Sequence, residues 1–289
     1  MAARFPLIDP SALPLARLLK QRIAAEVVSI FNDRDKGQRP VQRRADGLFG
    51  PQSIVWRVHG DVTSMMVGGV SGLLLQMLHP AVLAGVWDHS NFRADMLGRL
   101  RRTARFIALT SYGARDEAEA AIARVRSIHD RVSGRLLDGT PYRAGDPRLL
   151  AWVHVTESWS FLAGYIRYAE PRMTMADQDR YFAEMARLGQ KLGADPLPRS
   201  RVEALAILSG FRPELRFDQR TREVAGLVLN APAHKATAEP LHKLTMRAAV
   251  DLLPDWARHM HGLANPTPLT PLVRAGTLGI ARTLRWAFA

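Results

Sequence analysis

The most informative absence in this chain of 289 residues is cysteine, which does not occur at all. Without a thiol the protein has no disulfide, no thiolate nucleophile, no cysteine-ligated zinc or iron–sulfur cluster, and no covalently attached c-type haem. The lack of disulfides fits a reducing compartment. The residues from Met1 to Phe5 lead into no apolar segment of the kind that a secretory signal needs. We therefore expect a cytoplasmic location.

Acidic residues are scarce relative to basic ones. The chain has 27 Asp and Glu against 40 Lys and Arg, which gives a net charge of +13 and a pI near 11.0. Such an excess of positive charge is typical of proteins that contact nucleic acid or an anionic membrane surface. The arginines are spread along the chain, however, and no recognition helix, RNA-binding motif or zinc finger accompanies them. We expect no specific nucleic-acid partner, while peripheral contact with a membrane stays open.

The common signatures of catalytic and nucleotide-binding sites are missing. The chain has no GxGxxG, no Walker lysine loop, no HExxH and no Gly-x-Ser-x-Gly elbow. One Glu-x-x-His pair, Glu239 and His242, matches the motif of di-iron helical bundles. A di-iron site needs two such motifs and two further glutamates, so this pair does not predict one.

The longest apolar stretch runs from Asp61 to Trp87 and carries no formal charge after Asp61. Its length suggests a transmembrane helix. Gly68, Gly69, Gly72 and Gln76 dilute the stretch. The step from His79 to Pro80 disfavours a continuous helix, because a residue before proline is pushed out of the helical region. The pattern favours a buried core helix with a break at residues 79–80.

Helical periodicity and capping residues recur along the rest of the chain, and no alternation typical of strands persists. Asp95, Thr174 and Ser200 are expected N-caps. Gly134 is expected to stop the helix that begins near residue 118, and a loop is expected from there to Gly145. The sequence therefore predicts an all-α fold. Residues 1–13 are interpreted as an arm, residues 1–48 as an N-terminal helix and linker, and residues 49–289 as a single helical domain. The expected helices cover residues 15–32, 61–87, 96–109, 118–132, 147–165, 174–192, 200–208, 218–229, 240–253, 256–263 and 270–288.

The helix expected from Pro147 onward is the one around which the others are predicted to pack. Asp146 is a good N-cap, and Pro147 fits the first helical position, where no N–H is missed. Between Arg148 and Arg167 the only charged residue is Glu157. Apolar residues occupy every side, and a helix that is apolar all round is buried all round.

His154 lies in the middle of this helix, and a buried imidazole needs a reason. One interpretation is a core histidine that is hydrogen-bonded to a backbone carbonyl, since buried polar groups are usually satisfied in this way. The other is a ligand of haem iron, because neutral imidazole suits iron and haem needs an apolar slot. The residue pattern alone leaves both interpretations open.

Several linked motifs in order resemble the family of the latex-clearing protein and the MpaB-type oxygenases. The resemblance covers roughly residues 50–265. It is carried by Gln76-Met77-Leu78-His79-Pro80-x-Val82, Gly85-Val86-x-Asp88-His89-Ser90-x-Phe92, Arg99-Leu100-x-x-Thr103 and Trp152-Val153-His154-Val155-Thr156.

The resemblance implies an all-α fold with a globin-like core that holds one b-type haem. It places the iron ligand at His154. It also places two residues of the distal pocket at Arg99 and Thr103, and it puts Arg102 where rubber-cleaving members have a lysine. An arginine hardly ever loses its proton, so Arg102 cannot become the sixth iron ligand as a neutral lysine can.

Two further departures concern the surroundings of the histidine. Arginines flank the ligating histidine in rubber-cleaving members, whereas this chain has Ala151 and Ser158. The family's proposed glutamate base cannot be placed on this sequence. These differences argue against rubber as the substrate and leave the expectation of haem intact.

The same resemblance and the helical phase suggest further residues around the cofactor. We expect Ser158 or a backbone carbonyl to orient the second ring nitrogen of His154. Helical phase alone places Phe106 and Phe161 as walls of the pocket. His89 and Arg93 are candidates for a place near the haem or its propionates. The alternative for His89 is that it braces a helix end.

The function expected from all this is a haem-b-dependent oxygenase that acts with dioxygen on an apolar, isoprenoid-like or lipid-like substrate. Arg99, Arg102 and Thr103 are its candidate catalytic residues. One alternative is a haem-binding carrier or sensor without turnover. Another is a basic helical module that binds a membrane surface or nucleic acid and uses His154 only as a structural residue. The sequence does not predict the oligomeric state.

Overall fold

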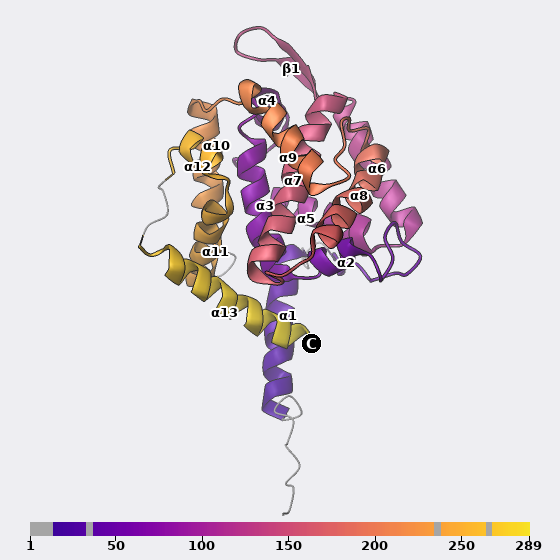
Figure 1. The fold of residues 1–289 in the computed structure, drawn as a ribbon, viewed down its shortest axis with the longest axis vertical. Helices are drawn as coiled ribbons and strands as arrows, with labels where there is room; N and C mark the ends of the chain where they lie inside the picture. The colour runs from indigo at the N-terminus through magenta and orange to yellow at the C-terminus, as the bar shows by residue number, and fades with distance from the viewer. Residues whose placement is uncertain (1–13, 33–36, 234–237, 264–267) are drawn as a thin grey trace, which may run out of the picture.

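The computed structural model describes residues 14–32, 37–233, 238–263 and 268–289, so the arm expected over residues 1–13 lies outside the described residues. The described part is helical apart from one two-stranded sheet, which confirms the predicted all-α fold (Figure 1). The helices are α1 (Pro14–Phe31), α2 (Ile54–His59), α3 (Val62–Gln76), α4 (Pro80–His89), α5 (Met96–Tyr112), α6 (Arg115–His129), α7 (Pro147–Tyr168), α8 (Met175–Leu192), α9 (Arg201–Gly210), α10 (Gln219–Leu229), α11 (Glu239–Leu252), α12 (Asp255–Met260) and α13 (Thr270–Phe288), with a 3-10 turn η2 (Arg212–Glu214).

Helix α7 occupies the centre of the fold, as its all-round apolar surface predicts. It packs against α2, α3, α4, α8, α9, α11 and α13. Asp146 caps its start, since its Oδ1 accepts hydrogen bonds from the backbone amides of Arg148 at 2.8 Å and Leu149 at 3.2 Å. The side chains expected to cap other helices do the same: Asp95 caps α5, Thr174 caps α8 and Ser200 caps α9.

Helices α3 and α7 approach each other so closely that Gly68 and Gly164 have no room for a side chain. A Cβ on Gly68 would lie 2.7 Å from the carbonyl oxygen of Ser160, and a Cβ on Gly164 would lie 2.8 Å from that of Ser64. The small residues that dilute the apolar stretch therefore serve helix packing. This close contact gives α7 one rigid wall along most of its length.

The apolar stretch is broken where the sequence predicts. Helix α3 ends at Gln76 and α4 begins at Pro80, with His79 as its N-cap: the imidazole Nδ1 accepts from the amide of Ala81 at 3.3 Å. Among the described residues, no single helix has the length and apolar character to cross a membrane. The α3–α4 pair has the required length and apolar character only when the two helices are taken together, and the pair is bent by 102°.

The expectations for residues 118–145 are wrong in two details. Helix α6 ends at His129, earlier than predicted, and strand β1 (Ser133–Arg135) then pairs antiparallel with β2 (Pro141–Arg143). Gly134, expected to stop the helix, lies inside the hairpin under the ring of Tyr142, where a Cβ would come within 2.9 Å of the ring carbon Cε1. The Tyr142 hydroxyl donates to Asp88 at 2.8 Å, so α4 holds the hairpin in place.

The N-terminal helix lies at the edge of the molecule. Helix α1 contacts α13 and α5, and its first half projects beyond the helical body (Figure 1). The proposed boundary between residues 48 and 49 stays a prediction.

Candidate functional site

His154 is buried in the middle of α7, with 5% of its surface exposed. Its Nε2 is buried and has no hydrogen-bond partner, so the interpretation of a core histidine satisfied at this nitrogen by a carbonyl does not hold. Burial lowers the pKa of His154 to about 4, because a charged imidazole would lose its hydration. The ring is therefore neutral at physiological pH, which is the form that binds metals.

The unpartnered nitrogen faces helix α8. A Cβ on Gly189 would lie 3.1 Å from Nε2 and would overlap Cδ2 of Leu197. Leu197 packs with Leu150 and Ala151 at the start of α7, so it covers the same region from the loop after α8. By its chemistry His154 fits the ligand of a haem iron, and a macrocycle at Nε2 requires Leu197 or α8 to move aside.

The side chains expected to surround His154 on α7 have other partners or none. The Ser158 hydroxyl is buried without a hydrogen bond, so it does not orient the ring of His154 in this structure. The Phe161 ring lies edge-on to His59, with 5.3 Å between the ring centroids. Phe106 is partly buried against the same main core. Their roles at a cofactor stay predictions.

The candidate catalytic residues lie on α5. Arg99 is half-buried and donates to the Ser90 hydroxyl at 2.7 Å. Arg102 is 62% exposed and pairs with Asp95 at 3.3 Å, and the exposed Thr103 hydroxyl donates to the Arg99 carbonyl one turn back at 3.3 Å. The structure does not bring Arg102 and Thr103 into contact with His154, and their catalytic role stays a prediction.

His89 is the last residue of α4, and Arg93 follows that helix. The His89 Nε2 lies 3.1 Å from the Ser133 carbonyl oxygen, so His89 joins the end of α4 to the hairpin. Arg93 stacks on Trp87, with its guanidinium carbon 3.8 Å from the ring centroid, and pairs with Glu223 at 2.8 Å. Neither residue faces His154.

A buried polar chain connects α2, α5 and α8. The His59 Nδ1 lies 2.7 Å from the Ser111 hydroxyl, and its Nε2 lies 3.0 Å from the Tyr181 hydroxyl. Burial lowers the pKa of His59 to about 3, so this imidazole also stays neutral. Sequence reasoning missed the chain, because residues 59, 111 and 181 share no motif and meet only through the packing of three helices.

Glu157 is the one charged residue in the central part of α7, one turn after His154. No hydrogen bond or ion pair to its carboxyl group is present among the described residues. Burial raises the pKa of Glu157 to about 7, because the anion is costly to desolvate. A carboxyl group with a raised pKa therefore lies one turn from His154 on α7.

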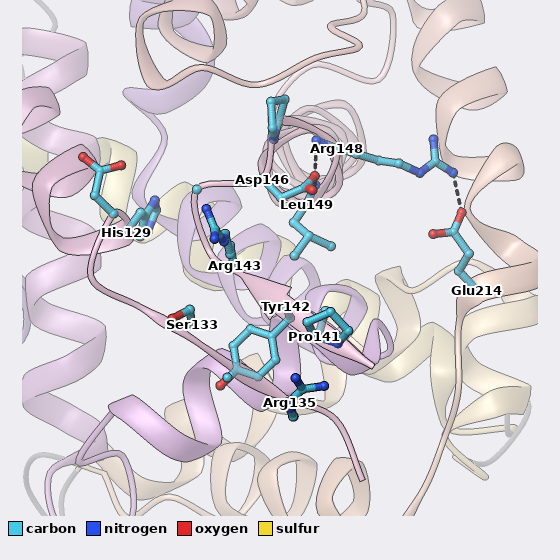
Figure 2. A pocket seen from close by; sticks show the side chains of 15 residues that line it. His129, Ser133, Arg135, Pro141, Tyr142, Arg143, Asp146, Arg148, Leu149 and Glu214 are labelled. Atoms are coloured by element: carbon cyan, nitrogen blue, oxygen red, sulfur yellow. Dashed lines mark hydrogen bonds and ion pairs between the residues drawn. The ribbon is translucent and has the colours of Figure 1, made fainter. Parts of the chain in front are cut away.

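An open cavity of about 930 Å³ lies at the N-terminal end of α7, between the end of α6, the hairpin and η2 (Figure 2). Cationic and ring side chains dominate its lining, which comprises Ala81, His129, Asp130, Ser133, Gly134, Arg135, Pro141, Tyr142, Arg143, Gly145, Asp146, Pro147, Arg148, Leu149 and Glu214. Sequence reasoning did not find this cavity, because its residues come from a segment interpreted as a loop. His129 and Arg143 come to line one cavity only when the hairpin folds back, so their positions in the sequence do not indicate the site.

The described residues contain no group of three or more His, Cys, Asp or Glu side chains that could hold a metal ion by themselves.

Comparison with known families gives one result. The family model described as "ER-bound oxygenase mpaB/B'/Rubber oxygenase, catalytic domain" matches residues 56–286. No curated protein and no solved structure gives a significant match. The family match spans α3 to α12 in full and includes His154, the α5 residues and the cavity.

Proposed function

Because the chain belongs to the MpaB and rubber oxygenase catalytic-domain family, we propose that it oxidises an apolar small molecule with dioxygen and uses haem b as its cofactor. Membership makes the chain an oxygenase-type enzyme, which implies a small-molecule substrate and dioxygen. The haem and the isoprenoid-like or lipid-like substrate are the proposal. A cytoplasmic location also stays a prediction.

The observation that supports haem is the unpartnered Nε2 of His154. A nitrogen buried without a hydrogen bond costs about 1–3 kcal/mol, and a function that needs the free lone pair explains why the chain tolerates this cost. The neutral imidazole binds iron without first releasing a proton. Haem b, when bound, supplies an iron that binds and activates dioxygen.

The chain's own residues supply a dry and shaped environment. The close α3–α7 contact and the apolar side chains of α7 exclude water from one side of His154, and Gly189 leaves space for the ring on the other side. A dry site strengthens every electrostatic interaction inside it. Leu197 is the side chain that has to move for the cofactor to reach Nε2.

Arg99, Arg102 and Thr103 are proposed as donors toward the negative charge that develops on reacting oxygen. Arg99 is the best placed of the three, because it is half-buried and its guanidinium is held by a hydroxyl and not by a carboxylate. Arg102 is held outward by Asp95, so its participation requires that this ion pair opens.

The experiment that tests this function is an oxygen-uptake assay on protein reconstituted with haem. A polyprenyl hydrocarbon and an unsaturated lipid are offered as substrates, and products are searched for new carbonyl groups. The proposal predicts substrate-dependent oxygen uptake that the haem-free protein lacks. Tight haem binding without oxygen uptake would favour the alternative of a haem carrier or sensor.

A further inference from the structure

The cavity at the N-terminal end of α7 is lined by charged side chains to which the proposed oxygenase chemistry assigns no role. Three guanidinium groups and three carboxylates line it, together with His129. Two of the carboxylates are already engaged. Asp146 caps α7, and Glu214 pairs with Arg148 and lies 3.6 Å from Nε2 of His79.

The remaining charges favour an anion. Asp130 is the C-cap residue of α6, and its carboxylate makes no ion pair among the described residues. It lines the cavity together with Arg135 and Arg143. Arg135 donates to the carbonyl of Gly139, whereas the Arg143 guanidinium makes no hydrogen bond or ion pair among the described residues. Figure 2 shows Arg143 and His129 among the side chains that line the cavity.

One wall of the cavity is apolar. Leu149, Ala81 and Tyr142 meet there and pack with neighbouring apolar side chains. Pro141 and Pro147 also line the cavity, and neither has a backbone N–H to offer. A cavity with one unpaired cation and such a wall suits a ligand with one anionic end and an apolar remainder.

We propose that this cavity binds the carboxylate or phosphate-monoester end of an amphiphilic small molecule, with Arg143 as its ion-pair partner. The guanidinium fork matches either group with two parallel hydrogen bonds. His129, which lines the same cavity, is the proposed second donor, and the apolar wall receives the start of the ligand's chain.

The identification of this ligand as the substrate rests on the proposed function. Leu149 in the cavity and His154 are five residues apart on α7, which corresponds to about 7.5 Å along the helix axis. The Asp195 amide donates to the Pro147 carbonyl at 3.0 Å, so the loop that carries Leu197 is joined to the cavity rim. A ligand held by its anionic end at Arg143 would therefore have its chain directed toward the cover of His154.

The test is a calorimetric titration of the full-length, haem-free protein with decanoate, decyl phosphate and decanol, each below its micelle-forming concentration. The proposal predicts binding of at least one anionic probe about tenfold or more tighter than decanol. Arg143→Gln should remove that preference. The control Arg282→Gln changes an exposed arginine of α13 and should leave it intact.

The two anionic probes distinguish a carboxylate ligand from a phosphate ligand. The anionic preference should also weaken as salt is raised, because an exposed ion pair is screened. Equal binding of decanol and both anions, or equal affinities in the Arg143 and Arg282 variants, would overturn the proposal. Thermal melting of each variant confirms that it is folded. The titration needs neither haem nor turnover, so its failure is distinct from a failure of the oxygenase proposal.

Discussion

Gly189 of α8 lies directly against the imidazole of His154 on α7: a methyl group at residue 189 would stand 3.1 Å from both Cε1 and Nε2 of the ring. The same methyl group would overlap Leu197. The missing side chain at residue 189 is therefore what lets a buried imidazole fit between two helices with its nitrogen free.

Gly189→Ala should weaken haem binding at His154. The new methyl group occupies the approach to Nε2 and pushes Leu197 toward the region that the cofactor needs. We expect a loss of stability of about 1–3 kcal/mol from overpacking, partly offset by the better helix propensity of alanine. Haem titration and urea unfolding measure the two effects.

Gly226→Ala is the matched control for this variant, because a Cβ on Gly226 of α10 meets no atom within 4 Å. It should stabilise the protein by up to about 1 kcal/mol and leave haem affinity unchanged. If Gly189→Ala bound haem as tightly as Gly226→Ala, the cofactor would not lie at this face of His154.

Gly68→Ala should destabilise the fold far more than Gly69→Ala. The first Cβ would lie 2.7 Å from the Ser160 carbonyl oxygen, so α3 and α7 must separate, whereas the second meets only Phe161 Cε1 at 3.6 Å. We expect a loss of about 1–3 kcal/mol for Gly68→Ala and no loss for its neighbour. Thermal unfolding of both variants measures the difference, and similar midpoints would contradict the close α3–α7 packing.

Glu157→Gln should change how stability depends on pH. Burial raises the pKa of Glu157 to about 7, so between about pH 4.5 and 7 the native carboxyl group holds a proton that the unfolded chain has released. The contribution of Glu157 is therefore fully favourable below pH 4.5, and it is lost as the pH rises through 7. A glutamine side chain does not titrate, so Glu157→Gln does not lose this contribution to stability as the pH rises.

The free energy of unfolding of Glu157→Gln, relative to that of the wild type, should rise by about 1–3 kcal/mol when the pH is raised from 5 to 8. Urea unfolding at the two pH values measures the gain, and subtraction of the wild-type curve removes the titration of the histidines. Glu119→Gln, on an exposed face of α6, is the control and should show no such gain. A constant difference between variant and wild type at both pH values would argue that Glu157 is solvated.

The sequence predicts most of the helices and their order because local signals define them. Asp95, Asp146, Thr174 and Ser200 begin helices where they were expected, and each caps with its own side chain. The His79–Pro80 break is also local. These features depend on residues within one turn of each other, so no knowledge of tertiary contacts is needed.

What the sequence does not predict depends on contacts between distant segments. The hairpin needs Tyr142 to cover Gly134 and reach Asp88, and strands of three residues carry no periodicity. The His59–Tyr181 contact joins α2 to α8. The burial of His154 follows from the apolar helix around it, whereas Gly189 as its neighbour does not follow from any spacing.

The measurement that tests the central claim most directly is the ultraviolet–visible spectrum of the purified protein with haem supplied during expression. Wild type, His154→Ala and the surface control His259→Ala are compared. The account predicts a Soret band in wild type and in His259→Ala, and its loss or a strong shift in His154→Ala. A folded, helical wild-type protein without a Soret band, or a His154→Ala spectrum identical to the wild type, would contradict it.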